Sequence, residues 1–232
     1  MATERERIDI LADFISTTSH ELRTPLSVIN TSLYMLMRSD DEVKRQQKAD
    51  QISNQVTYLN NMINQLHEAV RLDRIHELEL IPLSFESSIK AFLDHYLTQN
   101  PHVNIVSHIA LDVPLILGDR VYIDTILTHL VNNAVHFSDE GNRIELNVTL
   151  EGGMVALRVK DYGIGIAPQH LSQIFNPFYK VNPARTQGEN GVGVGLTIVK
   201  RLMQLHHGRV EVESKLGEGA VFTVYFPIAP LA

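Results

Sequence analysis

The N-terminal part of the chain repeats apolar residues at alternating steps of three and four, which is the spacing of a helix seam that packs against another helix. The first run comprises Ile8, Leu11, Ile15, Thr18, Leu22, Leu26, Ile29, Leu33 and Leu36. The second run comprises Ala49, Ile52, Val56, Leu59, Ile63, Leu66 and Val70. Between the runs, residues 38–43 read RSDDEV, a polar break that suits a turn and a new helix start. The pattern predicts an antiparallel helical hairpin.

The first run has one irregularity, because two steps of four follow each other around Leu22 and Leu26. Such an insertion locally unwinds a coiled-coil seam. Pro25 falls at the same point, and a proline inside a helix removes one backbone hydrogen bond. We therefore expect a local kink or bend at Pro25.

Two helices bury too little apolar surface to be stable alone. A second copy of the hairpin would cover both seams in a four-helix bundle, so the pattern predicts a homodimer. The alternative is that the hairpin packs on the rest of its own chain.

From about residue 75 the pattern changes to short alternating segments mixed with helical ones. Strands are predicted at 76–83 and 102–111, and helices at 85–97, 120–137 and 197–208. Residues 143–163 and 209–227 are predicted as β-hairpins, and Gly152-Gly153 supplies the first turn. Helices mixed with antiparallel strands predict an α+β layered domain. The expected domains are residues 1–72 and residues 73–232.

Composition excludes several classes of function. The net charge is −7 and no basic run stands out, which argues against a nucleic-acid scaffold. The chain has no cysteine, which excludes disulfides and cysteine sites. No signal peptide opens the chain, and no apolar run approaches the ~18 residues of a membrane span. We expect a cytoplasmic catalytic core cut from a longer protein that is either soluble or membrane-anchored.

The stretch STTSHELRTPL carries titratable residues inside the first predicted helix. His20 is two residues from both Thr18 and Leu22, so at about 100° per residue it points away from the seam. A mostly polar stripe continues on the same face through Thr24, Ser27, Thr31, Tyr34 and Arg38. This stripe is either a solvated surface or a docking track for a partner.

Three further segments each allow a ligand role and a plain structural role. DYGIGI (161–166) follows a predicted strand, and its Asp161 either accepts a hydrogen bond from an exocyclic amine or simply belongs to a turn. GENGVGVGLTIVK (188–200) opens into a helix, so it is either an anion site or a flexible loop. Asn133 lies within a predicted helix, where its amide oxygen can ligate magnesium or simply face solvent.

Taken together, the order of the motifs resembles that of the sensor histidine kinases. SHELRTPL, NNAVHFS, DYGIGI, IFNPFYKVNPAR, NGVGVGL and GEGAVF resemble their H, N, G1, F, G2 and C-terminal glycine boxes. The resemblance covers nearly the whole chain. It implies a dimerisation and histidine-phosphotransfer hairpin followed by an ATP-binding domain of the GHKL type, an α/β sandwich with a mobile lid.

The resemblance also implies roles for the hairpin residues. His20 would be the phospho-acceptor, Glu21 its general base, and Thr24 the residue that positions water in a phosphatase reaction. The phosphoryl group would pass from ATP to His20 and then to an aspartate of a response regulator receiver domain. An upstream sensor domain would complete the protein.

In the ATP-binding domain, Asp161 would accept the adenine amine and Asn133 would ligate Mg²⁺. Phe175 and Phe178 would anchor the lid. The remaining residues expected around the nucleotide are His136, Gly163, Gly165, Lys180, Arg185, Gly191, Gly193, Gly195 and Leu196.

Three positions depart from the family pattern. His129 replaces the first asparagine of the N box, His136 replaces a common lysine, and Ala220 replaces the usual Ser or Thr. If both imidazoles contact phosphate, ATP binding should tighten as the pH falls through the imidazole range. The departures keep open a degenerate kinase that acts as a dimeric scaffold or phosphatase. A non-kinase ATPase of the gyrase or chaperone type is disfavoured by the SHELRTPL motif.

Overall fold

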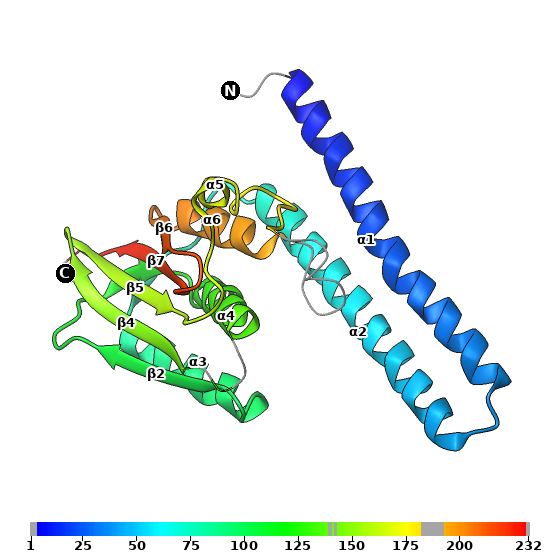
Figure 1. Ribbon diagram of the computed structural model, residues 1–232. Helices are drawn as coiled ribbons and strands as arrows, with labels where there is room; N and C mark the ends of the chain where they lie inside the picture. Colours follow the sequence, from blue (N-terminus) through cyan, green and yellow to red (C-terminus); the bar gives the residue numbers. More distant parts are fainter. Residues whose placement is uncertain (1–3, 139–140, 142, 182–192, 231–232) are drawn as a thin grey trace. The chain divides into compact units, whose positions relative to one another are not determined.

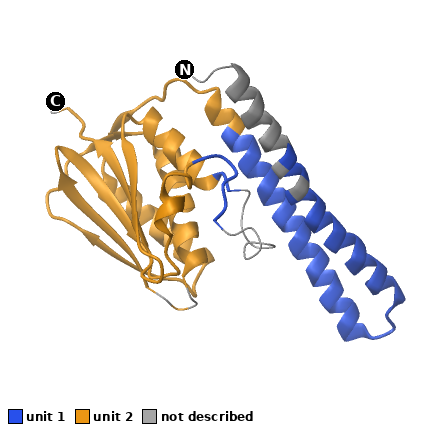
Figure 2. Cartoon of the chain, turned by 45° about the horizontal axis from the view of Figure 1, so that its top comes forward, with its two compact units in different colours: residues 1–69, 176–194 blue, residues 70–175, 195–232 orange. Residues whose placement is uncertain are grey.

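The structure is a computed structural model that describes residues 4–138, 141, 143–181 and 193–230, and for residues 4–15, 17 and 20 it describes the backbone alone. The chain forms two compact units. Unit 1 contains Met1–Ala69 and Asn176–Val194, and unit 2 contains Val70–Phe175 and Gly195–Ala232 (Figure 2).

The predicted helical hairpin is confirmed by α1 (Glu4–Arg38) and α2 (Glu42–Asp73), which Figure 1 shows as two long helices joined by a short turn. Asp41 starts α2, because its Oδ1 accepts the backbone N–H groups of Val43 (3.0 Å) and Lys44 (3.2 Å). α1 runs unbroken through Pro25. The bend expected there stays a prediction.

The hairpin seams divide into two sets of apolar positions. Leu22, Ile29 and Leu59 are partly buried within a single chain. The alternate positions are exposed to a large degree: Leu26 (49%), Leu33 (46%), Val56 (44%) and Ile63 (46%). One chain therefore covers only half of the seam pattern.

A buried polar contact sets the register between the two helices. Ser32 is 2% exposed, and its hydroxyl donates to Gln51 Oε1 at 3.1 Å. Lys48 Nζ donates to the same oxygen at 3.0 Å. Because a buried hydroxyl without a partner is costly, sliding the helices past each other would be penalised.

Unit 2 is built from a five-stranded sheet, helices on one of its faces, and a small two-stranded sheet (Figure 1). The strands are β1 (Ile81–Leu83), β2 (Asn104–Ile109), β3 (Ile116–Gly118), β4 (Arg143–Glu151), β5 (Met154–Lys160), β6 (Arg209–Ser214) and β7 (Ala220–Pro227). The helices are α3 (Phe85–Gln99), α4 (Arg120–Phe137), α5 (Pro168–Leu171) and α6 (Gly195–Leu205). The large sheet has the order β2-β4-β5-β7-β6, and β1 pairs with β3.

Both predicted β-hairpins are confirmed, since β4 pairs antiparallel with β5 and β6 with β7. Gly152 (φ 57°) and Gly153 (φ 76°) form the first turn in the left-handed region, as their sequence suggested. The helices at 85–97, 120–137 and 197–208 are also confirmed within a few residues.

Other expectations were wrong. Only Ile81–Leu83 of the predicted strand 76–83 is paired, and β3 and the short α5 were not anticipated. β2 pairs parallel with β4, a direction that the sequence had not indicated, since antiparallel pairing was predicted for the two hairpins alone. The reason is the connection, because α4 lies between these strands and a helical crossover returns the chain in the same direction.

Alternation along the strands produces the core of unit 2. Ile144, Leu146 and Val148 of β4 are buried, and the intervening residues are more exposed. β5 and β7 bury matching side chains against α4 and α6. The fully buried helical partners include Ile123, Ile126, Leu127, Leu130, Ile198 and Val199. A sheet with one apolar face and a helix layer explains the two-layer form.

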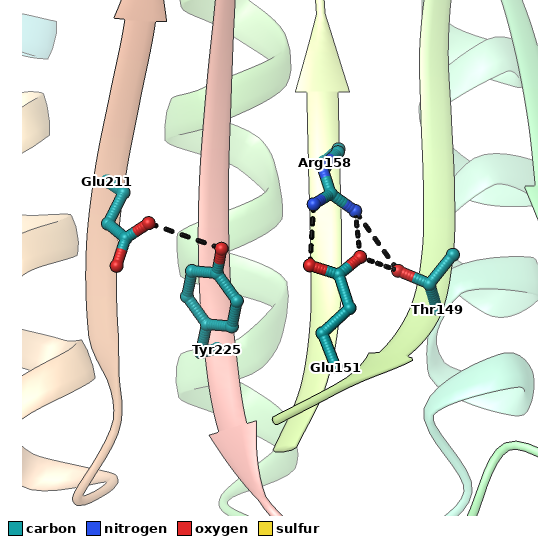
Figure 3. A network of polar contacts seen from close by, with 5 residues as sticks. All are labelled: Thr149, Glu151, Arg158, Glu211 and Tyr225. Atoms are coloured by element: carbon teal, nitrogen blue, oxygen red, sulfur yellow. Dashed lines mark hydrogen bonds and ion pairs between the residues drawn. The ribbon is translucent and has the colours of Figure 1, made fainter. Parts of the chain in front are cut away.

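The opposite face of the sheet is polar and is tied together by cross-strand contacts (Figure 3). Arg158 of β5 donates to Thr149 of β4 at 3.1 Å and to Glu151 Oε2 at 2.6 Å. These contacts, with Arg158 first, lower the pKa of Glu151 to about 2. Tyr225 of β7 donates to Glu211 of β6 at 3.2 Å. On this face, the charge of Glu151 is paired with Arg158, and Glu211 accepts a hydrogen bond from Tyr225.

His206, which follows α6, is fully buried (0% exposed) and is held as a neutral ring. Its Nδ1 lies 2.8 Å from the Leu202 carbonyl oxygen, and its Nε2 accepts the Asp119 backbone N–H at 3.1 Å. If Nε2 were protonated, its N–H would point at the Asp119 backbone N–H, and neither donor would have an acceptor. Burial is the main cause that lowers the pKa of His206, and the nearby His207 lowers it further. The Leu202 carbonyl and the Asp119 charge act in the opposite direction and raise it.

Acid should destabilise unit 2 through His206. The unfolded imidazole has the ordinary pKa of 6.5 and the folded one a lower value, so unfolded chains bind more protons below pH 6.5. The stability that neutral His206 contributes to unit 2 is fully present above pH 6.5. It is lost as the pH falls from 6.5 toward the pKa of His206 in the folded state. A His206→Phe variant should lose about 1–3 kcal/mol at pH 7, because the Asp119 N–H loses its acceptor.

The measurement is chemical denaturation of the full chain at pH 7 and pH 5, followed by circular dichroism. His206→Phe should show a smaller loss of stability on acidification than the unaltered chain. The exposed neighbour His207 has φ 54°, a conformation that asparagine tolerates, so His207→Asn is the control. Equal pH dependence in the unaltered chain and His206→Phe would refute this account.

Candidate functional site

Asp161 stands at the end of β5 as a buried carboxylate (4% exposed) that organises the loop after it. Its Oδ1 accepts the backbone N–H groups of Gly163 (2.9 Å) and Ala220 (3.1 Å). Burial raises the pKa of Asp161, and the two N–H groups act in the opposite direction. Because Oδ1 is engaged by the protein, Oδ2 is the oxygen suited to an external donor such as an exocyclic amine.

Gly163 and Gly165 are required by close backbone packing. A Cβ on Gly163 would lie 2.0 Å from the Phe137 carbonyl oxygen at the end of α4. Gly165 has φ 66°, and a Cβ there would lie 2.1 Å from the Lys215 carbonyl oxygen. The DYGIGI loop is therefore held against both neighbours, and this close packing fixes the position of Asp161.

Sequence reasoning assigned no role to Gly219 and Ser214, which support the same loop. Gly219 has φ 86°, and a Cβ there would lie 2.2 Å from the Asp161 carbonyl oxygen. Ser214 Oγ accepts the Ile166 N–H at 2.8 Å and donates to the Gly219 carbonyl at 2.6 Å. The glycines of the GEG triplet were the available signal for Gly219, whereas nothing in the local sequence indicated Ser214.

Helix α4 brings three candidate residues to one side through their spacing of four and three: His129, Asn133 and His136. The start of α6 lies against this side, because a Cβ on Gly195 would be 3.1 Å from His129 Nδ1. Gly195 and Leu196 open α6, so its first N–H groups lie near the same face. Such N–H groups are suited to bind an anion.

The two consecutive asparagines of α4 have different surroundings. Asn132 Oδ1 accepts the hydroxyl of Tyr96 at 2.8 Å. Asn133 is partly exposed, and among the described residues its side chain takes part in no hydrogen bond. Within the same residues there is no group of three or more His, Asp or Glu side chains that could hold a metal ion. The amide oxygen of Asn133 would suit a Mg²⁺ ion that takes its other ligands from elsewhere.

In unit 1, Glu21 of α1 is the centre of a second polar cluster. Lys180 Nζ donates to Glu21 Oε2 at 2.5 Å, and the Tyr58 hydroxyl of α2 lies 3.4 Å from the same oxygen. The side chains of Lys180 and Glu21 are only 10% and 20% exposed. Lys180 was expected near phosphates, and the structure places it on Glu21. Tyr58 was not anticipated by the sequence reasoning.

The segment that carries Lys180 is closed at its base by a backbone hydrogen bond. The Phe178 N–H donates to the Gly193 carbonyl at 3.0 Å. Phe178 has φ 65° and Gly193 has φ 75°, so both ends turn through the left-handed region. Arg185 and Gly191 lie outside the described residues.

The remaining candidates divide between the units. His20 lies in α1, where the description is limited to its backbone, and Thr24 is partly buried one turn further on. Phe175 ends a stretch of unit 2, and its carbonyl accepts the Thr197 hydroxyl of α6 at 3.2 Å. Ala220 donates its N–H to Asp161, so its missing hydroxyl does not disturb that contact.

Comparison with known proteins adds two family matches. Residues 10–75 match the His Kinase A (phospho-acceptor) domain. Residues 118–230 match the histidine kinase-, DNA gyrase B- and HSP90-like ATPases. The sensor protein SrrB of Staphylococcus aureus strain N315 is 31% identical over 237 residues, which cover 98% of this chain and 40% of SrrB. The chain thus spans about 40% of the length of the curated relatives it matches.

Solved structures show the same architecture. The full-length ShkA structure in complex with AMPPNP is 28% identical, has a TM-score of 0.66, and matches 95% of this chain and 46% of ShkA. ThkA, solved in complex with the response regulator protein TrrA, has a TM-score of 0.76 at 20% identity and matches 97% of this chain and 64% of its own. Among the residues described, none of the helices combines the length and apolar character that a membrane crossing requires. The chain therefore belongs to the sensor histidine kinases and carries their phospho-acceptor domain followed by their ATPase domain.

Proposed function

We propose that this chain is the core of a sensor protein-histidine kinase that phosphorylates His20 from ATP and passes the phosphoryl group to an aspartate of a response regulator. The observation that carries the proposal is that one chain holds both parts of the reaction. His20 and Glu21 lie in a phospho-acceptor domain, and Asp161 lies in an ATPase domain. The proposed domains are residues 1–72 for acceptance and 73–232 for nucleotide binding.

Asp161 would bind the adenine ring through Oδ2, while Gly163 and Ala220 hold Oδ1 in place. Asn133 would hold Mg²⁺, which supplies charge neutralisation of the phosphate oxygens when bound. The first N–H groups of α6, at Gly195 and Leu196, would add positive potential on the phosphate side. The other residues proposed to line the ATP site are His136, Lys180, Arg185, Gly191 and Gly193.

At the acceptor, a neutral ring nitrogen of His20 would attack the γ-phosphorus. The bond from that phosphorus to the β–γ bridging oxygen breaks, an N–P bond forms, and ADP leaves. Glu21 would hold the other ring N–H, fix the tautomer and take the proton as positive charge develops. Phosphoryl transfer depends mainly on alignment and charge neutralisation, so these positioning groups would account for most of the rate.

Three partners accompany the proposal. A second copy of the chain would cover the exposed apolar positions Leu26, Leu33, Val56 and Ile63, which repeat every seven residues along each helix. A receiver domain would dock on the polar face that continues from His20. A sensor domain would supply the signal, and the need for ATP would place this core in the cytoplasm.

We also propose phosphatase activity toward the receiver, with Thr24 positioning the attacking water. A second candidate function is a scaffold or phosphatase without kinase activity. The observations that favour it are His129, His136 and Ala220, which depart from the family pattern.

The test is incubation of the chain with γ-labelled ATP and magnesium. The expected product is a protein-bound phosphate that is labile in acid and stable in alkali, as a phosphohistidine is, and it should be absent from His20→Ala. A chain that binds ATP but takes up no label under any condition would favour the scaffold or phosphatase. Label that persists in His20→Ala would exclude His20 as the acceptor.

A further inference from the structure

The Glu21 cluster brings together three segments of unit 1. Glu21 belongs to α1, Tyr58 to α2, and Lys180 to the segment Asn176–Val194. Both donors address the same carboxylate oxygen, Oε2, at 2.5 Å for Lys180 and 3.4 Å for Tyr58. The first distance is that of a charge-assisted contact, and the second is long for a hydroxyl hydrogen bond. Lys180 is therefore the main partner of Glu21.

The ion pair between Lys180 and Glu21 differs from an ordinary surface ion pair because both side chains are largely shielded from water. Only 10% of the Lys180 side chain and 20% of the Glu21 side chain are exposed, so water screens the attraction little. The Lys180 ammonium group already donates to Glu21 Oε2, so the ring N–H of His20 would have to compete with it for this carboxylate. In the arrangement described, Glu21 is thus occupied by Lys180.

We propose that Lys180 is a positioning residue that restrains Glu21, and that phosphoryl transfer to His20 requires Lys180 to leave the carboxylate. This inference rests on the proposed function, in which Glu21 takes the ring proton of His20. When Lys180 leaves, Tyr58 remains as the neighbour that keeps the carboxylate oriented. Release needs only a change of rotamer, because the lysine stem is flexible while the Phe178–Gly193 hydrogen bond anchors the nearby backbone.

Tyr58 provides a spectroscopic report on the cluster. Burial first, and then the charge and hydrogen bond of Glu21, raise the pKa of Tyr58 to about 12. In Glu21→Gln the charge is removed, so the Tyr58 pKa should fall while burial keeps it above the ordinary 10.0. The titration is followed by NMR of ¹³C-labelled tyrosine, with Tyr58→Phe used to assign the signal.

The kinetic test separates the rate at saturating ATP from the apparent KM. In Lys180→Gln the rate of phosphohistidine formation at saturating ATP should rise about two- to tenfold, because Glu21 is relieved of its partner. The KM for ATP should rise as well, since Lys180 is also proposed on the phosphate side. Lys180→Arg keeps a cation on Glu21, so its saturating rate should stay below that of Lys180→Gln. In a Glu21→Gln background, Lys180→Gln should no longer raise the rate.

Each outcome decides a different point. Suppose that the unaltered chain forms phosphohistidine but the rate of Lys180→Gln at saturating ATP is unchanged or lower. The proposed restraint on Glu21 is then wrong, while the proposed kinase function stands. A rise that persists in the Glu21→Gln background also overturns it. An unaltered Tyr58 pKa in Glu21→Gln shows that the cluster does not form in solution and overturns the inference on structural grounds. Absence of label in the unaltered chain overturns the proposed kinase function itself.

Discussion

An Asp161→Asn variant should lose at least about 100-fold in ATP affinity while remaining folded, because a charged hydrogen bond is replaced by a repulsive contact. The amide oxygen of asparagine can still accept the N–H groups of Gly163 and Ala220, which Asp161 Oδ1 accepts at 2.9 and 3.1 Å. The amide NH₂ then takes the place of Oδ2. In the proposed complex this NH₂ group would face the adenine amine, and two hydrogen-bond donors facing each other repel.

The measurement is the dissociation constant for ATP by calorimetry, together with the circular dichroism spectrum and thermal midpoint. Asp112→Asn makes the same chemical change at an exposed residue with φ 58°, where asparagine is tolerated, and should leave ATP binding unchanged. Asp161→Ala should lose both ATP binding and stability, because the two N–H groups lose their acceptor. An Asp161→Asn variant that binds ATP as tightly as the unaltered chain would exclude Asp161 as the adenine acceptor.

A Gly163→Ala variant should damage stability and nucleotide binding together. The added Cβ would lie 2.0 Å from the Phe137 carbonyl oxygen and 2.6 Å from its carbon. Both are backbone atoms at the end of α4, so no side chain can turn aside and the loop itself must move. We expect a loss of about 1–3 kcal/mol in the free energy of unfolding. A displaced Gly163 N–H would also leave Asp161, so ATP affinity should fall as well.

The matched control is Gly152→Ala in the turn between β4 and β5. Gly152 has φ 57°, and a Cβ there would meet no atom within 4 Å. The control should cost about 1–2 kcal/mol through its backbone conformation alone, without any change in ATP affinity. Denaturation and calorimetry on both variants separate the two effects. Normal ATP binding by Gly163→Ala would mean that the loop relaxes without moving Asp161.

Elements whose partners are close in sequence were predictable. The seams of α1 and α2 carry their spacing within one helix, and the turn between β4 and β5 is marked by Gly152-Gly153. The direction of β2 was not predictable, because its pairing depends on the crossover through α4 and not on its own residues. The strand expected over 76–83 shrank to Ile81–Leu83, since only that part finds a partner in β3.

The candidate site shows the same division. Asp161, Asn133 and the glycines were proposed because ordered motifs mark them in the sequence. The reason for Gly163 was not visible, since its contact is the Phe137 carbonyl of another element. Lys180 and Glu21 are separated by 159 residues, and no local pattern relates them. Ser214 was missed because its hydroxyl acts on the Ile166 N–H, 48 positions earlier in the chain.

The hydrogen bond between Phe178 and Gly193 has a consequence for how this region can change over evolutionary time. A loop whose two ends are joined absorbs insertions cheaply, since each doubling of its length costs only about 0.6 kcal/mol of closure entropy. Residues between the two ends can therefore be added or removed while the ends keep their separation. We therefore expect Lys180, two residues after Phe178, to keep its place on Glu21 when residues are inserted between Phe178 and Gly193.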